Sequence, residues 1–281
     1  MSAGGADDAR ADRTIAPDLA HVRETIAARG ITLGKPLTIA QETESTNDDA
    51  KRGARAGAEH GALWLAESQT AGRGRQGRAW VSPRGENLLF SVLLRLRCPP
   101  ARVPLVSLAC GLAVRDAVAR ALGASREAEV AVKWPNDVLI NGKKVAGVLV
   151  ESALAGPKVE YVVVGIGINV LTRALPEELA ATATSLAIEG AVGLDRAEIL
   201  ADVLVGLDRD VELVTHRGLG LVHGRLTRHD ALAGREVEST EVGSSLRGTA
   251  CGIDLEGRLL VRKPDGTVTK VSSGELRLRV L

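Results

Sequence analysis

Glycine and arginine alternate between Gly72 and Arg78, and this short segment limits the folds that the chain can adopt. Its first six residues, GRGRQG, match the G-x-G-x-x-G spacing of dinucleotide-binding turns. That spacing works only where a helix follows at once, because the helix N-terminus must face the pyrophosphate. Here Pro83 and Gly85 interrupt the next residues and an apolar run begins at Leu88, which excludes a helix. A nicotinamide-binding fold is therefore not expected, and the phosphate-binding motif GxxxxGK[ST] is absent from the sequence.

The same segment carries the groups that hold anions. Arginine makes bidentate contacts to phosphate or carboxylate, and glycine lets the backbone approach a ligand closely. Taken alone, these residues also fit a solvated basic loop or a contact with single-stranded nucleic acid. No aromatic residue lies between the arginines, and 36 basic residues against 35 acidic ones leave the chain almost neutral, which disfavours nucleic acid. Any anion site must therefore be local.

Apolar segments divide the rest of the chain into strands and helices. Strands are expected at 37–41, 62–66, 87–95, 138–140, 145–150 and 159–168. Helices are expected at 18–29, 48–56, 103–122 and 195–215. Ser45-Thr46-Asn47 is a typical helix start, Asp195 and Glu198 have the spacing of a capping box, and Asn141-Gly142 predicts a hairpin turn.

From about Arg235 the sequence changes to short alternating segments broken by glycines. These glycines recur at turn-like intervals, at Gly243, Gly248, Gly257, Gly266 and Gly274, and Asp265-Gly266 predicts a hairpin turn. The pattern indicates a small antiparallel barrel over 231–281. A large domain is expected over 17–230, preceded by a tail over 1–16 that is rich in Ala, Asp, Arg and Gly and is expected to be disordered.

Aromatic residues are scarce, with three Trp, one Tyr and one Phe. A core of Ala, Val, Leu and Ile needs no tryptophan for bulk, yet Trp80 and Trp134 lie in polar segments broken by glycine or proline. Core filling and a role at a site both remain open for these two residues. Three scattered cysteines have no metal-ligand spacing, and no secretory signal or membrane span is visible, so a cytoplasmic protein with free thiols is expected.

Two further segments combine polar residues with strand ends. In Lys133-Trp134-Pro135-Asn136-Asp137, Pro135 favours a strand end, from which Lys133 would project rigidly; a surface lysine beside a structural turn is the alternative. Gly165-Ile166-Gly167-Ile168-Asn169 ends an apolar strand. Glycines at such a place mark either close approach of a ligand or tight packing of the sheet.

Together these segments resemble the biotin protein ligase family, over roughly Lys35 to Leu281. The sharpest signatures are QTAGRGRQGR at 69–78 and KWPNDVLI at 133–140. KVAGVLVE at 144–151, GIGIN at 165–169 and Gly252-Ile253-Asp254 support them in family order. The resemblance implies an α+β fold, in which a mixed or antiparallel sheet is flanked by helices in a class II synthetase-like catalytic domain, followed by a small SH3-like β-barrel.

The resemblance also implies roles for individual residues. Ser45, Thr46 and Gln69 would meet the ureido end of biotin. Arg73 and Arg75, with the backbone of Gly74, would hold the valerate carboxylate and the α-phosphate, and Lys133 would lie at the reacting groups. Trp80 would pack near the adenine, and Asn136 and Asn169 are candidates for phosphate or magnesium contacts. The remaining members of the expected ligand surface are Asn47, Gly72, Gly147 and Gly167.

The implied activity is ATP-dependent activation of biotin, with Mg²⁺, and transfer to the biotin carboxyl carrier domain of acetyl-CoA carboxylase. Family members are often homodimers. About 35 residues precede the first shared strand, too few for the DNA-binding domain of the larger members, so direct DNA binding is not expected. A lipoate- or octanoate-handling relative is the alternative enzyme, and a biotin-responsive regulator the alternative from another class.

Overall fold

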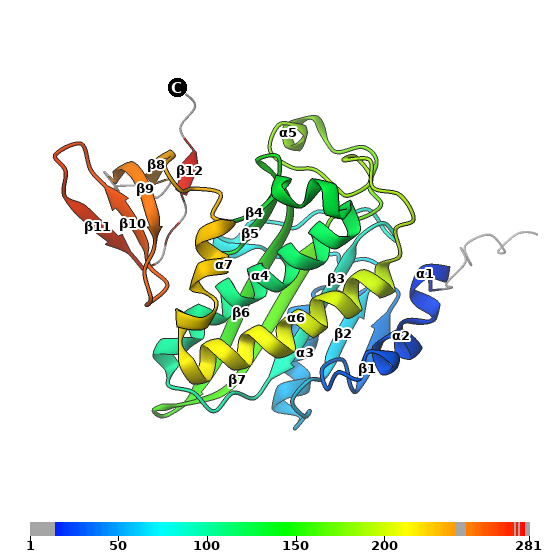
Figure 1. Ribbon diagram of the computed structural model, residues 1–281. Coiled ribbons are helices and arrows are strands. Elements are labelled where there is room, and N and C mark those ends of the chain that lie inside the picture. The colour runs from blue at the N-terminus through cyan, green and yellow to red at the C-terminus, as the bar shows by residue number, and fades with distance from the viewer. Residues whose placement is uncertain (1–14, 240–245, 273, 275, 279–281) are drawn as a thin grey trace, which may run out of the picture.

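A seven-stranded mixed sheet forms the centre of the larger domain, in the order β1-β2-β3-β7-β6-β5-β4 (Figure 1). The computed structural model describes residues 15–239, 246–272, 274 and 276–278. β1 and β2 run parallel, and every other pair of neighbours is antiparallel. The strands of this sheet are β1 (Leu37–Ala40), β2 (Leu63–Ala66), β3 (Leu88–Leu94), β4 (Val130–Lys133), β5 (Asp137–Ile140), β6 (Lys143–Ala155) and β7 (Lys158–Ile168).

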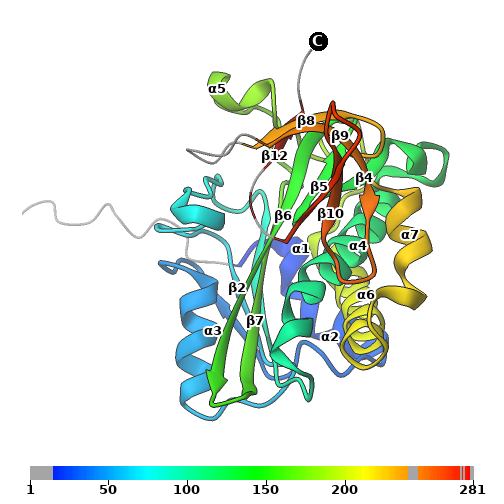
Figure 2. The same cartoon turned by 90° about the vertical axis from the view of Figure 1, so that its left-hand side faces the viewer.

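Helices cover both faces of the sheet, so the domain has three layers (Figure 2). α4 and α6 lie on one face and α3 on the other. The α-helices are α1 (Pro17–Ala20), α2 (Val22–Ala28), α3 (Thr46–Arg55), α4 (Val103–Leu122), α5 (Glu177–Ala180), α6 (Arg196–Arg217) and α7 (His223–Arg228). Short 3₁₀ turns lie at Arg75–Gly77, Pro100–Arg102, Ala124–Glu129 and Leu219–Leu221. No helix among the described residues is long and apolar enough to cross a membrane.

Small side chains let α3 approach the sheet closely. Ala50 and Ala54 are buried on its inner face, and a Cβ placed on Gly53 would come within 2.2 Å of the Trp64 ring. The apolar helix α4 packs its Leu, Val and Ala side chains against the other face and against α6, where most of the core lies. The α+β class and the mixed sheet flanked by helices, both implied by the family resemblance, are confirmed.

The N-terminal helix expected at 18–29 is wrong as a single helix. It is broken at His21 into α1 and α2, and both His21 and Asp18 of α1 reach the start of α6. His21 Nε2 lies 3.1 Å from Asp195 Oδ2, and Asp18 pairs with Arg196. Residues 1–14 of the tail expected at 1–16 lie outside the described residues. Ile15 packs against the core, and the backbone N–H of Ala16 donates to Glu67 at 2.8 Å.

The capping box expected at the start of α6 is present only in part. Asp195 accepts hydrogen bonds from the N–H groups of Ala197 and Glu198, as an N-cap should. The Glu198 carboxylate accepts from Arg29, the residue that follows α2, so this side chain connects α6 to the end of α2. In a complete capping box the Glu198 side chain would bond the backbone N–H of Asp195; here it pairs with Arg29 instead.

Five antiparallel strands form the C-terminal sheet, in the order β11-β10-β9-β8-β12. They are β8 (Glu236–Ser239), β9 (Arg247–Ile253), β10 (Leu259–Arg262), β11 (Val268–Val271) and β12 (Leu276–Leu278). The predicted turn at Asp265-Gly266 joins β10 to β11, and the expected turn at Gly243 lies outside the described residues. This small β-unit agrees with the SH3-like barrel implied by the resemblance.

The C-terminal β-unit is docked on the larger domain beside the segment that carries Lys133. A Cβ on Gly257, in the β9–β10 turn, would lie 2.7 Å from Leu105 of α4, so this turn packs closely on the helix. The indole N–H of Trp134 donates to the Gly257 carbonyl at 3.0 Å. The linker between the two units adds to the free edge of β4, because Val132 N donates to His229 O at 2.7 Å.

A buried ion cluster fixes the place where the chain leaves β2. Arg196 is fully buried and donates to Asp18 at 2.7 Å and to Glu67 at 2.8 Å. Glu67 is only 2% exposed and precedes Gln69 by two residues. Burial raises the pKa of Asp18, but hydrogen bonds and charge from Arg196 outweigh it, so the pKa is lowered. The stability from Asp18 is therefore present above its ordinary pKa and is lost as the pH falls.

We expect Arg196→Met to lower the free energy of unfolding by about 3–5 kcal/mol, because the buried Glu67 carboxylate loses its cation. Urea denaturation measures the change. Adding Glu67→Gln should recover part of the loss, and Arg217→Met, exposed at the far end of α6, should cost less than about 0.5 kcal/mol. If Arg196→Met and the wild-type protein had the same urea midpoint of unfolding, the proposed role of the cluster would be contradicted.

Candidate active site

A cavity of about 670 Å³ opens where the sequence motifs converge. Its walls come from the 72–80 segment, the start of α3, the β4–β5 connection and the glycine-containing parts of β6 and β7. The expected ligand residues that line it are Ser45, Thr46, Asn47, Gln69, Arg73, Gly74, Arg75, Trp80, Lys133, Asn136, Gly147, Gly167 and Asn169. Gly72 alone among the expected residues does not line it.

The glycine-arginine segment is a small hairpin. Trp80 N donates to Gly72 O at 2.8 Å, and Gly74 N donates to Arg78 O at 2.7 Å. Only a three-residue 3₁₀ turn interrupts it, so the prediction that no helix follows the glycines is confirmed. At the tip, Gly77 has a positive φ of 74°, which suits glycine. Gly72 is buried at the base of the hairpin, where a Cβ would lie 2.9 Å from the Trp80 carbonyl oxygen.

The first turn of α3 is capped from outside the helix. Ser45 is the N-cap residue but makes no side-chain cap bond, contrary to the expectation for this helix start. The Gln69 side chain caps the helix instead, because its Oε1 accepts hydrogen bonds from Thr46 N at 2.8 Å and from Thr46 Oγ1 at 3.1 Å. The Ser45 hydroxyl, on a side chain that is almost fully buried, is thereby left at the cavity wall.

A chain of hydrogen bonds fixes Asn47 under the cavity. Ser91 Oγ lies 2.6 Å from Asn47 Oδ1, and Asn47 Nδ2 donates to Glu151 at 2.7 Å. A Cβ on Gly165 would lie 2.0 Å from Asn47 Oδ1. Of the two interpretations left open for the GIGIN glycines, close packing therefore explains Gly165.

Gly147 and Gly167 have a different neighbour, the ring of Trp80. These glycines are paired across β6 and β7, and a Cβ on Gly167 would lie 2.6 Å from the indole. Lys144 Nζ stands 5.4 Å from the ring centroid, within cation–π range. The Trp80 Nε1 atom is buried and has no hydrogen-bond partner among the described residues. Trp80 thus lies at the cavity over the sheet glycines, whereas Trp134, which also lines the cavity, is only 2% exposed and belongs to the core.

Lys133, at the end of β4, and Arg75, near the hairpin tip, line the cavity, and neither has a carboxylate partner in the described part of the chain. Arg75 NH1 donates to the Gly274 carbonyl at 3.2 Å and reaches Asn136 Oδ1 at 3.5 Å. Asn136 Nδ2 donates to Val148 O at 2.9 Å, which fixes the side chain. Such an arrangement can stabilise an anion between the hairpin and the β4–β5 connection.

Arg73 differs from Arg75, because its NH2 lies 2.6 Å from Asp48 Oδ1. The hydrogen bond from Arg73, against the effect of burial and with help from Lys51, lowers the pKa of Asp48 to about 2. Both residues of this pair are therefore charged across the physiological range.

One wall of the cavity was missed by sequence reasoning. Its residues come from the connection that contains α5 and are Leu175, Leu179, Ala181, Thr182 and Ala183. This connection pairs with β6, since Lys144 N donates to Thr182 O at 2.8 Å, and Asn169 Nδ2 holds it through Thr184 O at 2.9 Å. The sequence there has no regular apolar period, so only the fold brings these side chains to the site.

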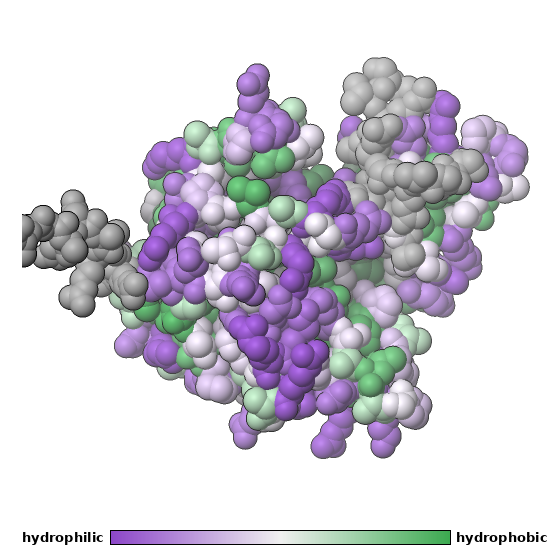
Figure 3. All heavy atoms as spheres, turned by 180° about the vertical axis from the view of Figure 1, so that it is seen from behind, coloured by the Kyte–Doolittle hydropathy of each residue, from purple (hydrophilic) through white to green (hydrophobic). Residues whose placement is uncertain are grey.

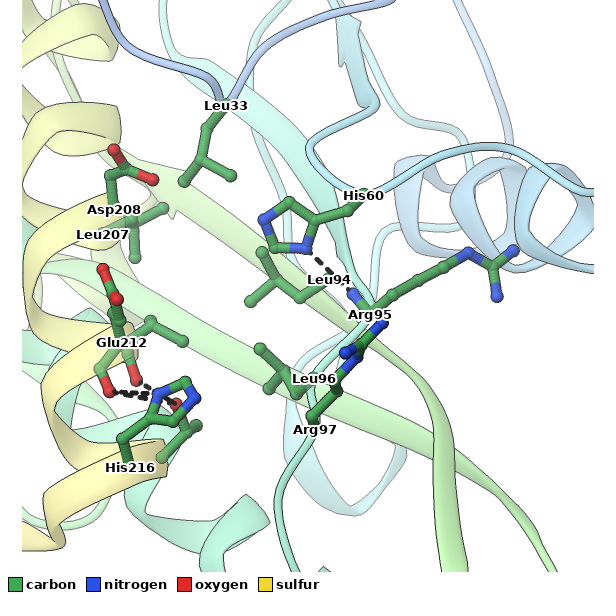
Figure 4. A pocket seen from close by; sticks show the side chains of 12 residues that line it. Leu33, His60, Leu94, Arg95, Leu96, Arg97, Leu207, Asp208, Glu212 and His216 are labelled. Carbon is green, nitrogen blue, oxygen red and sulfur yellow. Dashed lines mark hydrogen bonds between the residues drawn. The ribbon is translucent and has the colours of Figure 1, made fainter.

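A second cavity, of about 260 Å³, lies between the end of β3 and α6 and shares no lining residue with the first (Figure 4). Its floor is apolar, and Asp208, Glu212 and His216 of α6 face His60 and Arg97 across it. None of these residues belongs to a motif found in the sequence. The first cavity, which gathers the motifs, is therefore the candidate active site.

Known proteins are similar to this chain over most of its length. Residues 39–169 match the biotin/lipoate A/B protein ligase family, and residues 233–279 match the biotin protein ligase C-terminal domain. The biotin--[acetyl-CoA-carboxylase] ligase of Mycobacterium tuberculosis is 37% identical over 86% of this chain and 88% of its own. The bifunctional ligase/repressor BirA of Bacillus subtilis is 32% identical over 88% of this chain and 75% of its own.

Among solved structures, biotin protein ligase from Aquifex aeolicus in complex with biotin and ATP is 32% identical, with a TM-score of 0.69. The match covers 87% of this chain and 99% of the Aquifex chain. The fold and the cavity thus define a ligase-type catalytic domain followed by a small C-terminal β-unit. The chain belongs to the biotin protein ligase family.

We expect Gly165→Ala to destabilise the protein by about 1–3 kcal/mol, because the new Cβ displaces Asn47 and leaves buried polar groups unpaired. Thermal unfolding measures the loss. Gly224→Ala is the matched control, since a Cβ there has nothing within 4 Å. Equal stability of the two variants would show that Asn47 moves without cost.

Proposed function

We propose that the protein activates biotin with ATP to biotinyl-5′-AMP and transfers the biotinyl group to one lysine of a biotin carboxyl carrier domain, in the cytoplasm. The observation that carries this proposal is the convergence of Lys133 and Arg75, from separate elements, on one cavity without a carboxylate partner in the described chain. The likeness to ligases whose names specify biotin and acetyl-CoA carboxylase supports the choice of substrate and acceptor.

The first step joins two anions. A carboxylate oxygen of biotin attacks the α-phosphorus of ATP, an O–P bond forms, and pyrophosphate leaves with the electrons of the bond that breaks. Two like charges ~4 Å apart repel by about 4 kcal/mol at an effective dielectric of 20. Lys133 and Arg75, fixed before the substrates meet, would offset this repulsion where charge develops. Asn136, held by Val148, is placed to contact the phosphates.

The bicyclic ring of biotin is proposed to lie near the start of α3. The Ser45 hydroxyl is not used for capping, and Thr46 and Gln69 are fixed by their mutual bonds, so these groups suit the ureido function. We place the adenine near Trp80 and the apolar wall of Leu175 and Leu179, which would exclude water from the purine. The buried Nε1 of Trp80 is an unused donor on this wall.

Mg²⁺ is proposed to enter with the ATP phosphates, whose charge it would partly neutralise. The described residues contain no group of three or more His, Cys, Asp or Glu side chains that could hold a metal ion. Phosphate oxygens and water would therefore supply most of its ligands, as Mg²⁺ often requires, with Asn136 or Asn169 as candidate neighbours.

In the second step, the amine of the carrier lysine attacks the acyl carbon, an amide bond forms, and AMP leaves. The mixed anhydride must be kept from water until then. The hairpin at 72–80, which spans from α3 to the C-terminal β-unit, is proposed to shield it. Homodimerisation stays a prediction of the family resemblance.

The decisive experiment is incorporation of labelled biotin into a purified carrier domain with MgATP. Absence of incorporation by a protein that binds biotin tightly would reject the proposal. Lipoate is the competing substrate, and competition binding separates it from biotin. The match of residues 233–279 to a biotin protein ligase domain favours biotin. A DNA-binding regulator would instead give a salt-dependent gel shift.

We expect Lys133→Ala to slow biotinyl-AMP formation by at least about a hundredfold, the effect of removing one preorganised charge contact. Pyrophosphate release measures the rate, and circular dichroism checks that the fold survives. Lys158→Ala, an exposed lysine outside the cavity, is the control. Near-normal adenylate formation by Lys133→Ala would remove this residue from the mechanism.

We expect Arg75→Ala to release biotinyl-AMP about tenfold faster or more, because the hairpin tip loses its contacts to the ligand and to Gly274. The measurement is a chase of labelled adenylate without acceptor. Arg55→Ala, exposed at the end of α3, should leave release unchanged. Unchanged release from Arg75→Ala would count against the hairpin as a shield.

A further inference from the structure

The two arginines that flank Gly74 have opposite surroundings. Arg73 makes a 2.6 Å ion pair with Asp48 of α3, whereas Arg75 contacts a backbone carbonyl and, at 3.5 Å, an amide oxygen. Both were assigned to the reacting anions on the strength of the family motif. Asp48 already neutralises the charge of Arg73. Of these two arginines, therefore, only Arg75 has a charge that is available to bind a ligand.

We propose that Asp48 and Arg73 form the fixed anchor of the hairpin, which makes Asp48 a positioning residue, while the tip at Arg75 opens and closes over the ligand. The effect that we expect this anchor to have on the reaction rests on the proposed function. In this arrangement the reacting anions are met by Arg75 and Lys133.

Asp48 is itself held in place before it meets Arg73. Lys51 Nζ lies 2.8 Å from Asp48 and 2.8 Å from Glu151, and Glu151 also accepts from Asn47. Asp48 stands in the first turn of α3, where the helix dipole favours a negative charge. Its side chain is about one quarter exposed, so the pair is less screened by water than one on an open surface. Hydrophilic side chains dominate the middle of the face that carries α3 (Figure 3).

The anchor acts on the site through Trp80. Arg73 lies opposite Ala79 in the hairpin, and Trp80 N closes the base by donating to Gly72 O. Holding Arg73 to α3 therefore holds the strand that presents Trp80 to Gly147 and Gly167. The two hydrogen bonds of Arg75, at 3.2 and 3.5 Å, are longer than the anchor pair and would break before it.

The test compares a broken anchor with a reversed one in the full chain. Asp48→Asn removes the charge, Arg73→Asp opposes two carboxylates, and the double variant Asp48→Arg with Arg73→Asp restores the pair in reverse. Lys51 keeps Glu151 as a partner in every variant. Asp49→Asn is the matched control, because Asp49 bonds Thr43 and Arg52 and lies outside the cavity wall.

The first readout is amide hydrogen exchange at Trp80 and Gly74 in the ligand-free protein, so it does not depend on the reaction. We expect exchange about fivefold faster in Asp48→Asn, faster still in Arg73→Asp, and slower in the double variant than in Arg73→Asp. Unchanged exchange in Asp48→Asn, or no recovery in the double variant, would overturn the anchor.

The second readout is release of labelled biotinyl-AMP, which should follow the same order, while the rate of adenylate formation in Asp48→Asn changes less than about twofold. If Arg73 instead contacts the reacting anions, adenylate formation falls with Arg73→Asp and the double variant does not recover it, which would refute the assignment of charge to Arg75 and Lys133. A protein that forms no biotinyl-AMP would fail the proposed function, and hydrogen exchange would still decide the anchor.

Discussion

The register of β7 between β3 and β6 is the constraint on which the rest of the site depends. It sets Gly167 directly opposite Gly147 and places Gly165 beside Ser91. Because glycines at these positions leave the sheet surface bare, Asn47 and the Trp80 ring can lie directly on it. A slip of one residue would bring branched side chains to this face and would close the floor of the cavity.

Local sequence patterns were sufficient to predict an element where its structure depends only on residues within that element. The helix at 103–122 has the predicted bounds, and the turn at Asn141-Gly142 joins β5 to β6 as its residues require. The sequence also predicted Lys133 at a strand end, because Pro135 follows too closely for the strand to continue. These predictions depend on periodicity and turn chemistry within a few residues, and distant partners do not alter them.

Predictions failed or stayed open where a distant side chain competes for the same group. Ser45 has the right residue type for an N-cap, yet Gln69, which follows β2, bonds the Thr46 N–H. Nothing near Glu198 indicates that Arg29 will take its carboxylate. The wall that includes Leu175 lacks any motif, since its place depends on pairing with β6. Such competition is decided by tertiary packing and is invisible to local propensity.

The same argument explains why identical residue types in one motif receive different roles. Arg73 and Arg75 are separated by a single glycine, and the family resemblance implies the same role at the anions for both. Both line the cavity, but the fold places a carboxylate, Asp48, against Arg73 and leaves Arg75, like Lys133, without a carboxylate partner among the described residues. In an almost neutral chain, the position of one acidic residue on α3 therefore decides where positive charge remains available. A motif identifies the cationic residues, but the carboxylates packed around them determine which of these residues can bind a substrate.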